Sequence, residues 1–501
     1  MIKNRLKLGC ALLVLLAGPA AAETPKRDEL KAAVAASHDK TVKALQDWIK
    51  LPTIAAEGLN VDKGADYMRQ LALDAGFQKA KVVASGGVPG VFATLDAGAP
   101  VTLGVYFMYD VKQFDPAEWT SPPLEAKLVD RPGEGLVMMG RGVVNQKGPE
   151  MAFLAALKAF KATGRKLPVN LVLVAEGEEE IASPNFPTVV ADPEVTAALK
   201  KTAGVFIPTA SQTNAGTAGI TLGAKGSVEF QLIVGGETSD KYPKADIHSS
   251  NHARIESPAW RLVKALDTLV ADDGHTPAID GWFENVKPLT ARQKELITIG
   301  VKSRAEADVK KELGIGRWID NEDFQTSSER FLSQPTVNIQ GLVSGYTGPG
   351  GKTVLPGRAE AKLEFRLVPD MTRAEAETKL KAHLAKRGFD DVKVNVSGGY
   401  GPNQTDENTA FIQAQKRTLD KAGIPYTLTP RNAGSWPGVV FNGKPLNLPA
   451  GQFGVGRGGG AHAPDEWFLI KSSNPKVAGL DDATMLYVDL LYEIAATGGK
   501  K

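Results

Sequence analysis

The sequence has almost no cysteine: Cys10 is the only one in 501 residues. It lies in an N-terminal stretch with a basic start, a short apolar run at residues 8–16 and small residues at 20–22. This pattern is typical of a secretory signal peptide. We therefore expect residues 1–22 to be removed and the mature chain, beginning near Glu23, to be periplasmic or secreted. That chain would contain no thiol, which excludes disulfides, cysteine nucleophiles and cysteine-based metal sites.

The sequence also lacks the patterns of membrane and nucleic-acid proteins. No run reaches the roughly 18 apolar residues of a membrane-spanning helix. The 59 basic and 57 acidic residues nearly cancel, and no basic stretch carries interleaved aromatic residues. We therefore expect neither nucleic acid nor a membrane as a partner. The hydrophobic content of 43% is that of a globular protein, and the length suffices for two or three domains.

Apolar runs alternate with helical patterns in the first half of the chain. The runs at 101–108, 169–175 and 203–207 are nearly continuous, as in parallel strands that are buried on both faces. Helical periodicity at 27–50 and 149–163 accompanies them. This alternation predicts a doubly wound α/β catalytic domain.

The pattern changes after about residue 224. Within residues 358–368, apolar side chains at 359, 361, 363, 365 and 367 alternate with charged ones at 358, 360, 362, 364 and 366, which predicts a sheet with one packed and one open face. We expect 224–397 to form a smaller α+β domain, inserted between the two parts of the catalytic domain at 23–223 and 398–501.

A cluster of glutamates follows one of the predicted strands. Glu176, Glu178, Glu179 and Glu180 come directly after the apolar run at 169–175, where ligands bind in open α/β sheets. Because like charges this close repel, at least one glutamate is expected to have a raised pKa or a nearby cation.

Several segments, in order along the chain, resemble the M20 family of metallopeptidases, in its branch of carnosinase-like dipeptidases. They are MYDVKQFDPAEWTSPP, GRGVVNQKGPE, AEGEEEIASPNF, DIHSS, GGKTVLP, FRLVP, RNAGSWP and GAHAPDE. The resemblance implies a catalytic domain with an inserted lid domain through which two copies form a homodimer. It also implies a small peptide or N-acyl amino acid as substrate.

The family holds two metal ions, normally zinc, through five side chains. Their positions fall on Met108, Asn145, Glu180, Thr209 and His462, with Asn145 in place of the aspartate shared by both ions. Only Glu180 and His462 are good ligands, while Asn145 offers one neutral carbonyl oxygen. We therefore expect a degenerate site with no two-metal centre and at most one divalent ion, such as zinc.

The resemblance also assigns the catalytic and substrate-binding residues. It makes Glu179 the general base and Asp110 the residue that orients the missing first histidine. It makes His248 a lid residue that reaches the scissile carbonyl of a substrate bound in the partner subunit. Thr353, Arg366 and Ser435 match substrate-binding positions, and Arg366 would hold the terminal carboxylate.

Three functions remain open from the sequence. The first is an exported peptidase or amidohydrolase that acts on dipeptides or N-acyl amino acids with at most one metal ion. The second is a metal-independent acid–base enzyme that uses Glu179 for isomerisation, cyclisation or acyl transfer on a peptide-like substrate. The third is a peptide-binding protein that has lost catalysis.

Overall fold

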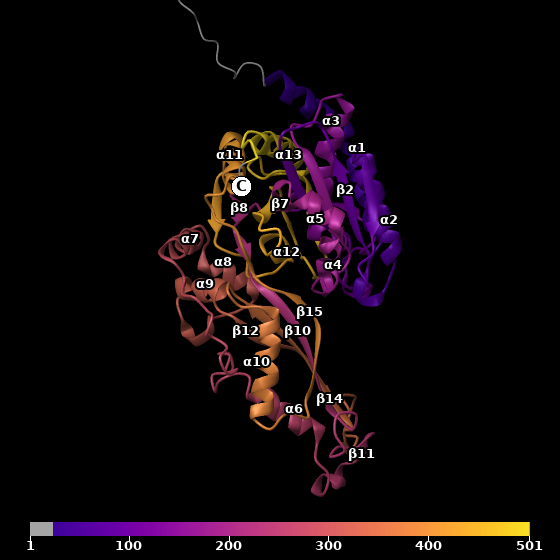
Figure 1. The fold of residues 1–501 in the computed structure, drawn as a ribbon, viewed down its shortest axis with the longest axis vertical. Coiled ribbons are helices and arrows are strands. Elements are labelled where there is room, and N and C mark those ends of the chain that lie inside the picture. Colours follow the sequence, from indigo (N-terminus) through magenta and orange to yellow (C-terminus); the bar gives the residue numbers. More distant parts are fainter. Residues whose placement is uncertain (1–23, 500–501) are drawn as a thin grey trace, which may run out of the picture.

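An eight-stranded mixed sheet forms the centre of the larger domain (Figure 1). The computed structural model describes residues 24–499, so the predicted signal peptide lies outside the described residues. The middle strands β6, β3, β7 and β18 are parallel, and β3, β6 and β7 are the three predicted apolar runs. The spatial order is β1 (Lys79–Val83), β2 (Gly90–Leu95), β6 (Asn170–Glu176), β3 (Thr102–Met108), β7 (Thr202–Pro208), β18 (Ala450–Phe453), β8 (Ala218–Thr221) and β17 (Tyr426–Thr429).

Helices cover both faces of this sheet, which confirms the predicted α/β fold. The helices on one face and the helices on the other contribute to two separate apolar cores. In the first core, Phe153 packs edge-on against Phe206 and Tyr487. One face carries α1 (Thr24–Ile49), α2 (Val61–Ala75), α3 (Gly148–Ala162), α11 (Ala410–Ala422) and α13 (Leu480–Ala495); the other carries α4 (Phe186–Ala191), α5 (Pro193–Leu199) and α12 (Val439–Asn442).

A four-stranded antiparallel sheet forms the smaller domain. Its spatial order is β12 (Thr336–Ser344), β14 (Arg358–Leu367), β10 (Gly226–Gly235) and β15 (Lys393–Tyr400), and α6 (Pro258–Asp267) and α10 (Arg373–Lys386) pack on it. In β14 the apolar residues are buried and the charged residues are more exposed, as the alternation predicts. At the end far from the larger domain, β11 (Ile247–His248) pairs with β13 (Val354–Leu355) (Figure 1).

Three helices of the predicted insertion pack beside the larger sheet instead. They are α7 (Ala291–Lys302), α8 (Glu306–Leu313) and α9 (Phe324–Ser333). Helix α7 packs against the edge strand β17, and its Leu296 belongs to the core of the larger domain. The insertion therefore contributes one wall beside the catalytic sheet as well as a separate domain.

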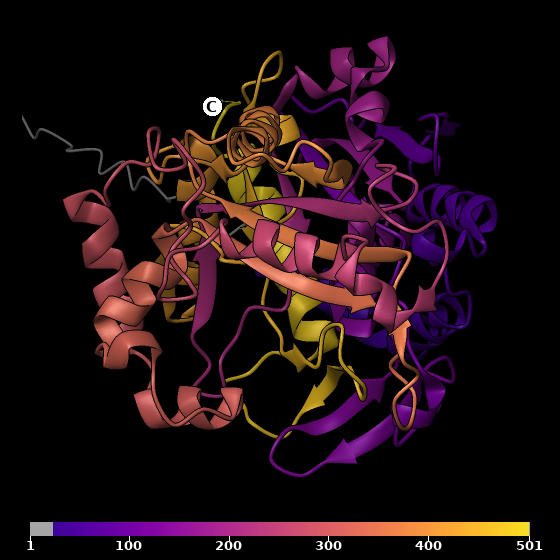
Figure 2. The same ribbon diagram turned by 90° about the horizontal axis from the view of Figure 1, so that it is seen from below.

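A second antiparallel sheet of four strands joins distant parts of the chain. Its spatial order is β19 (Gly458–Gly459), β20 (Trp467–Ser472), β5 (Gly135–Met139) and β4 (Lys127–Arg131), and β16 (Asn403–Gln404) pairs with β9 (Gly223–Ala224) elsewhere. Figure 2 shows β4 and β5 beside the C-terminal β20. This sheet brings the segment before Asn145 next to the segment after His462. Within residues 24–499, no helix has both the length and the apolar character needed to cross a membrane.

Candidate active site

Neighbouring parallel strands end together at one edge of the larger sheet. Met108, the last residue of β3, is in register with Glu176, the last residue of β6. Strand β7 lies on the other side of β3 and leads into Thr209. The short helical turn Glu179–Ile181 follows β6, so the glutamate cluster lies at this edge, as expected for a ligand site in an α/β sheet.

The loop that carries Asn145 is fastened by a buried carboxylate, Glu466. Its oxygens accept hydrogen bonds from Arg141 Nη1 (2.9 Å) and from the backbone nitrogens of Gly142 (2.9 Å), Val144 (2.9 Å) and Asn145 (3.0 Å). The side chains of Arg141 and Glu466 are only 3% and 1% exposed. Glu466 therefore fixes the backbone from which Asn145 projects.

Asn145 lies between Glu180 and His462, the two good metal ligands that the sequence resemblance predicts. Its Nδ2 donates to Glu180 Oε1 at 2.8 Å and lies 2.9 Å from Nε2 of His462. The same imidazole nitrogen is 3.2 Å from Glu180 Oε2, and Lys112 Nζ is 3.6 Å from that oxygen. The buried carboxylate thus has an amide N–H, an imidazole and an ammonium group around it.

The other two positions that the resemblance assigns to metal ligands, Met108 and Thr209, carry weak or neutral donors. Met108 is buried and offers a thioether, and Thr209 offers a hydroxyl. These donors are poor ligands for zinc in a site built of carboxylates and imidazoles. Across residues 24–499, no group of three or more histidine, cysteine, aspartate or glutamate side chains is arranged to hold a metal ion.

Glu179 has a partly buried carboxyl at the same edge. Burial is the main cause that raises its pKa well above the ordinary value, followed by the charges of Glu180 and Asp110. Asp110 is fully buried, and its carboxylate accepts hydrogen bonds from the backbone nitrogens of Glu179 (3.3 Å) and Glu180 (3.0 Å). Asp110 therefore positions the turn that presents Glu179.

The other two glutamates of the cluster are held by protein groups. Glu176 accepts hydrogen bonds from Tyr106 (2.8 Å) and Ser183 (2.9 Å), and burial raises its pKa well above the ordinary value. Glu178 accepts from the backbone of Val88 (3.1 Å) and from both nitrogens of Asn185 (2.9 and 3.2 Å). Within the cluster, Glu179 is the carboxyl that lines the adjacent cavity.

Two of the predicted substrate-binding residues meet near this site. Arg366 Nη1 donates to Ser435 Oγ at 2.7 Å, and a second guanidinium nitrogen pairs with Glu364. Burial and the nearby charge of Glu179 raise the pKa of the buried Tyr400, while the side chain of Ser435 acts against this rise. Tyr400 therefore lies close enough to both Glu179 and the Arg366–Ser435 pair to be influenced by each.

His248 and Thr353 lie elsewhere, at the far end of the smaller domain. His248 is in β11, and Thr353 directly precedes β13, the strand paired with it. The backbone nitrogen of Ser249 donates to Thr353 O at 3.0 Å. His248 is exposed, and its Nδ1 contacts Ser250 Oγ at 2.8 Å. One copy of the chain therefore brings these two predicted residues together but keeps them apart from Glu179.

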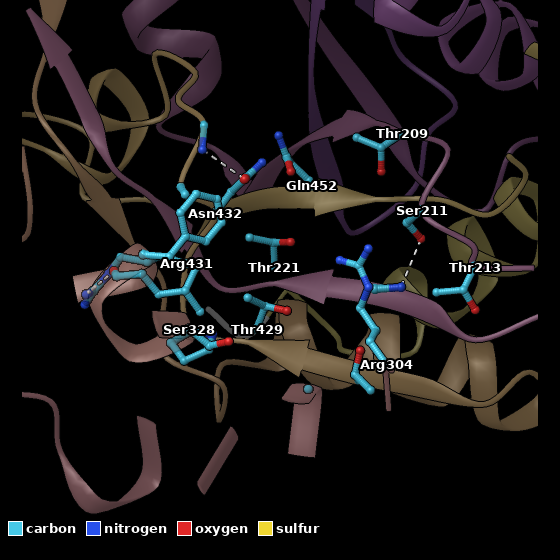
Figure 3. Close-up of a pocket in the computed structure, with 18 of the residues that line it drawn as sticks. Thr209, Ser211, Thr213, Thr221, Arg304, Ser328, Thr429, Arg431, Asn432 and Gln452 are labelled. Atoms are coloured by element: carbon cyan, nitrogen blue, oxygen red, sulfur yellow. Dashed lines mark hydrogen bonds between the residues drawn. The ribbon is translucent and has the colours of Figure 1, made fainter. Parts of the chain in front are cut away.

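A cavity of about 810 Å³ opens beside Glu179 (Figure 3). Met108, Asn145 and Thr209 line it together with Ser435. It continues between the strands β8 and β17 and the helices α7–α9. The volume lies in the range of about 300–1,000 Å³ that is common for ligand sites.

Sequence reasoning missed three residues that shape the site: Lys112, Tyr400 and Glu466. Lys112 and Glu466 lie inside the family-like segments MYDVKQFDPAEWTSPP and GAHAPDE, so those segments held a usable signal. Tyr400 ends the strand β15, and nothing in its local sequence marks it.

The chain belongs to peptidase family M20/M25/M40, whose sequence model matches residues 109–490. Among curated proteins, it is 28% identical over 448 residues to the Cys-Gly metallodipeptidase DUG1 of Saccharomyces cerevisiae, covering 83% of this chain and 89% of the relative. It is 26% identical over 368 residues to the Beta-Ala-His dipeptidase of Homo sapiens, covering 69% of each.

Solved structures agree with this assignment. The M20 family metallo-carboxypeptidase Sso-CP2 from Sulfolobus solfataricus is 30% identical, with a TM-score of 0.79, and the match covers 91% of this chain and 99% of that one. Human carnosine dipeptidase 1 is 22% identical with a TM-score of 0.74, covering 94% and 100%, and shares the fold. The predicted family and its peptidase class are therefore confirmed.

Proposed function

We propose that the chain is an exported amidohydrolase that cleaves dipeptides or N-acyl amino acids bearing a free carboxylate, with Glu179 as the proton-transferring group. The placement of Glu179 in one cavity with Ser435, which is bonded to Arg366, supports this proposal. A guanidinium and a neighbouring hydroxyl can both donate hydrogen bonds to the terminal carboxylate of a substrate. The names of the curated relatives, Cys-Gly metallodipeptidase and Beta-Ala-His dipeptidase, support dipeptides as the substrate class.

In the proposed step, Glu179 takes a proton from a water molecule as the water oxygen bonds to the scissile carbonyl carbon. The carbon–nitrogen bond then breaks, and the proton passes from Glu179 to the leaving nitrogen. The products are a free acid and a free amine. A raised pKa makes the Glu179 carboxylate a stronger base toward water, and the carboxylic acid formed in that step then returns the proton to the leaving nitrogen.

We also propose that the degenerate site does not hold two metal ions. In relatives of this family two cations are expected, but here the Asn145 amide N–H faces both Glu180 and His462, and Lys112 adds a positive charge. Donors of this kind balance a buried carboxylate without a metal. Because the donor set does not fit a two-ion centre, no step of the proposed reaction depends on one.

A second copy of the chain would complete the site. His248 and Thr353 are paired through their strands but lie far from Glu179, so another copy is the natural source of these residues. Strand β12 is the edge of the smaller sheet and exposes Ile339, Leu342 and Val343. An edge strand with exposed apolar side chains favours pairing between copies.

Asn145 also favours a second candidate function, proton transfer without hydrolysis. If its amide replaces the ion that activates water, Glu179 could serve isomerisation, cyclisation or acyl transfer instead. Mass spectrometry of products formed in oxygen-labelled water separates these reactions. Hydrolysis places the label in the acid product, the other reactions do not, and a purely binding protein gives no product at all.

Removal of the Arg366 guanidinium tests the substrate class. Arg366→Met is expected to raise KM for a dipeptide about 10–100-fold, because a charged hydrogen bond to the carboxylate is lost. The same variant should change KM for the corresponding dipeptide amide little. Arg358→Met, at the exposed end of the same strand, is the matched control. If Arg366→Met raised KM equally for the dipeptide and its amide, the proposed binding of the terminal carboxylate by Arg366 would be contradicted.

Export predicts a mature chain without a thiol. Intact-mass measurement of protein recovered from outside the cytoplasm is expected to show a chain that begins near Glu23. That protein, unfolded in denaturant, should not react with a thiol reagent, because Cys10 is the only cysteine. A recovered chain that retains Cys10 would contradict the proposed cleavage.

A further inference from the structure

Two buried cationic side chains, Lys225 and Arg431, lie next to the proposed site for the terminal carboxylate. They are only 3% and 5% exposed. Within residues 24–499, no aspartate or glutamate lies within ion-pairing distance of either side chain. The equally buried Arg141, by contrast, pairs with Glu466. Because burial disfavours an isolated charge, buried cations in proteins are normally paired. Lys225 and Arg431 therefore depart from this rule.

The electrostatic surroundings of Lys225 show the same surplus of positive charge. Burial, followed by the charges of Arg431 and Arg366, lowers the pKa of Lys225 to about 7. Burial also lowers the pKa of Arg431 to about 10. Of these three cations, only Arg366 has a carboxylate partner in the described part of the chain, namely Glu364. An anion placed among them would therefore be attracted by two uncompensated cations.

Both cations have more hydrogen-bond donors than the described residues use. Lys225 Nζ donates to Gln334 O at 2.7 Å, and Arg431 Nη1 donates to Leu332 O at 3.0 Å. An ammonium group has three donors and a guanidinium five. The buried Nε of Arg431 has no hydrogen-bond partner among residues 24–499. Since a carbonyl oxygen carries no full charge, the two bonds position the cations without balancing their charge.

Stabilisation of α9 explains only part of this arrangement. The carbonyl oxygens of Leu332 and Gln334 lie at the C-terminal end of that helix, which favours a nearby positive charge. A neutral amide side chain could donate the same hydrogen bonds without the free-energy cost of burying a charge. Two cationic side chains beside a cavity are better explained by an anion that enters from it.

The two cations are also close to the residues that would bind the end of a substrate. The backbone nitrogen of Lys225 donates to Asn432 O at 2.9 Å, so Lys225 lies beside the segment that carries Arg431. Arg431 lines the cavity, as does Ser435 (Figure 3). Strand β10 begins directly after Lys225 and pairs with β14, the strand that carries Arg366. A substrate held by Arg366 therefore places its last residue near the two buried cations.

We propose that Lys225 and Arg431 form a second anion-binding subsite next to the site for the terminal carboxylate. Its ligand is a small anion: either the side-chain carboxylate of a C-terminal aspartate or glutamate, or a free inorganic anion such as chloride that binds together with a neutral substrate. Either anion accepts hydrogen bonds from the remaining donors and balances the buried charge. This inference rests on the proposed binding of the substrate at Arg366, and it does not depend on how the substrate is cleaved.

Dipeptides that differ only in charge test the subsite. In the Glu179→Gln protein, Ala-Glu or Ala-Asp is expected to bind about 10–100-fold more tightly than the matching amide, Ala-Gln or Ala-Asn, because charged hydrogen bonds are gained. The double variant Lys225→Gln and Arg431→Gln, which keeps an amide donor at each position, should abolish the preference. Arg417→Met, on α11 outside the cavity, should leave it unchanged.

A chloride titration distinguishes the two sources of the anion. If the ligand is inorganic, replacing gluconate by chloride at constant ionic strength should tighten the binding of Ala-Gln to the Glu179→Gln protein, and the double variant should not respond. Equal affinity for acid and amide peptides together with no response to chloride would overturn the subsite, and this result needs no change at Lys225 or Arg431. Either effect surviving in the double variant would also overturn it.

Arg366→Met separates this inference from the proposed site for the terminal carboxylate. Ala-Glu and Ala-Gln both keep that carboxylate, so the variant should weaken the binding of both by the same factor. If Arg366→Met weakened neither, the proposed role of Arg366 would fail. A preference for Ala-Glu that disappears in the double variant would still support the subsite.

Discussion

Glu179→Gln is expected to lower kcat for a dipeptide by about 10²–10⁴-fold, the usual contribution of a positioned acid–base group. Glutamine keeps the shape of the side chain but cannot take up or release the proton. Steady-state kinetics with quantified products measure the loss. Glu118→Gln, an exposed glutamate outside the site, is the control and should retain full activity. Undiminished turnover by Glu179→Gln would remove Glu179 from the mechanism.

The pH dependence of the same reaction follows from the raised pKa of Glu179. Burial and the charges of Glu180 and Asp110 disfavour its ionised form. Because the base acts as a carboxylate, activity should rise as pH increases through this raised pKa. The acidic limb of the kcat/KM profile is therefore expected above the ordinary glutamate value of about 4.3. A limb at or below that value would contradict the environment described for Glu179.

Glu466→Gln is expected to destabilise the fold by about 3–5 kcal/mol, as when one partner of a buried ion pair is removed. The change leaves Arg141 buried without its counter-charge and places an amide N–H near backbone donors. Urea unfolding measures the loss. Because the loop with Asn145 is fastened by the same carboxylate, activity at temperatures well below unfolding should fall as well.

The chain offers a matched control for this variant. Glu29 pairs with Arg165 at the surface, where the glutamate side chain is 58% exposed. Glu29→Gln is expected to cost no more than about 1 kcal/mol, since exposed ion pairs contribute little. If Glu466→Gln and Glu29→Gln shifted the urea midpoint equally, the hydrogen bonds of Glu466 would not stabilise the loop that carries Asn145.

Much of the fold could be predicted because its signals are local. The continuous apolar runs became the parallel strands β3, β6 and β7, and the alternation predicted within 358–368 became β14. The helical periodicities at 27–50 and 149–163 became α1 and α3. A strand buried on both faces gives a continuous apolar run, a strand buried on one face gives alternation, and a helix buried along one stripe gives helical spacing. Each of these patterns can be recognised without knowledge of distant contacts.

The placement of α7–α9 was not predictable in the same way. No helices were predicted there from the sequence, and only the tertiary structure shows that α7 packs on β17 and that Leu296 joins the core of the larger domain. The sheet that pairs β5 with β20 also joins residues more than 300 positions apart. Contacts of this kind arise from chain topology, which leaves no local period.

The candidate site was also predicted only in part from the sequence. Family-like segments located Glu179, Glu180, Asn145 and His462, and the structure brings the last three within hydrogen-bonding distance. The sequence did not show that the amide of Asn145 faces both other side chains, or that Lys112 approaches Glu180. Those features depend on side-chain orientation, which is set by Glu466 and by the turn after β6.

Metal content tests the central claim most directly. The mature protein is incubated with excess zinc, desalted and analysed for bound metal, with the triple variant Met108→His, Asn145→Asp and Thr209→Asp as the positive control. The account predicts at most one ion per native chain and two per chain of the triple variant, whose donors suit zinc. Two tightly bound ions in the native chain would contradict it.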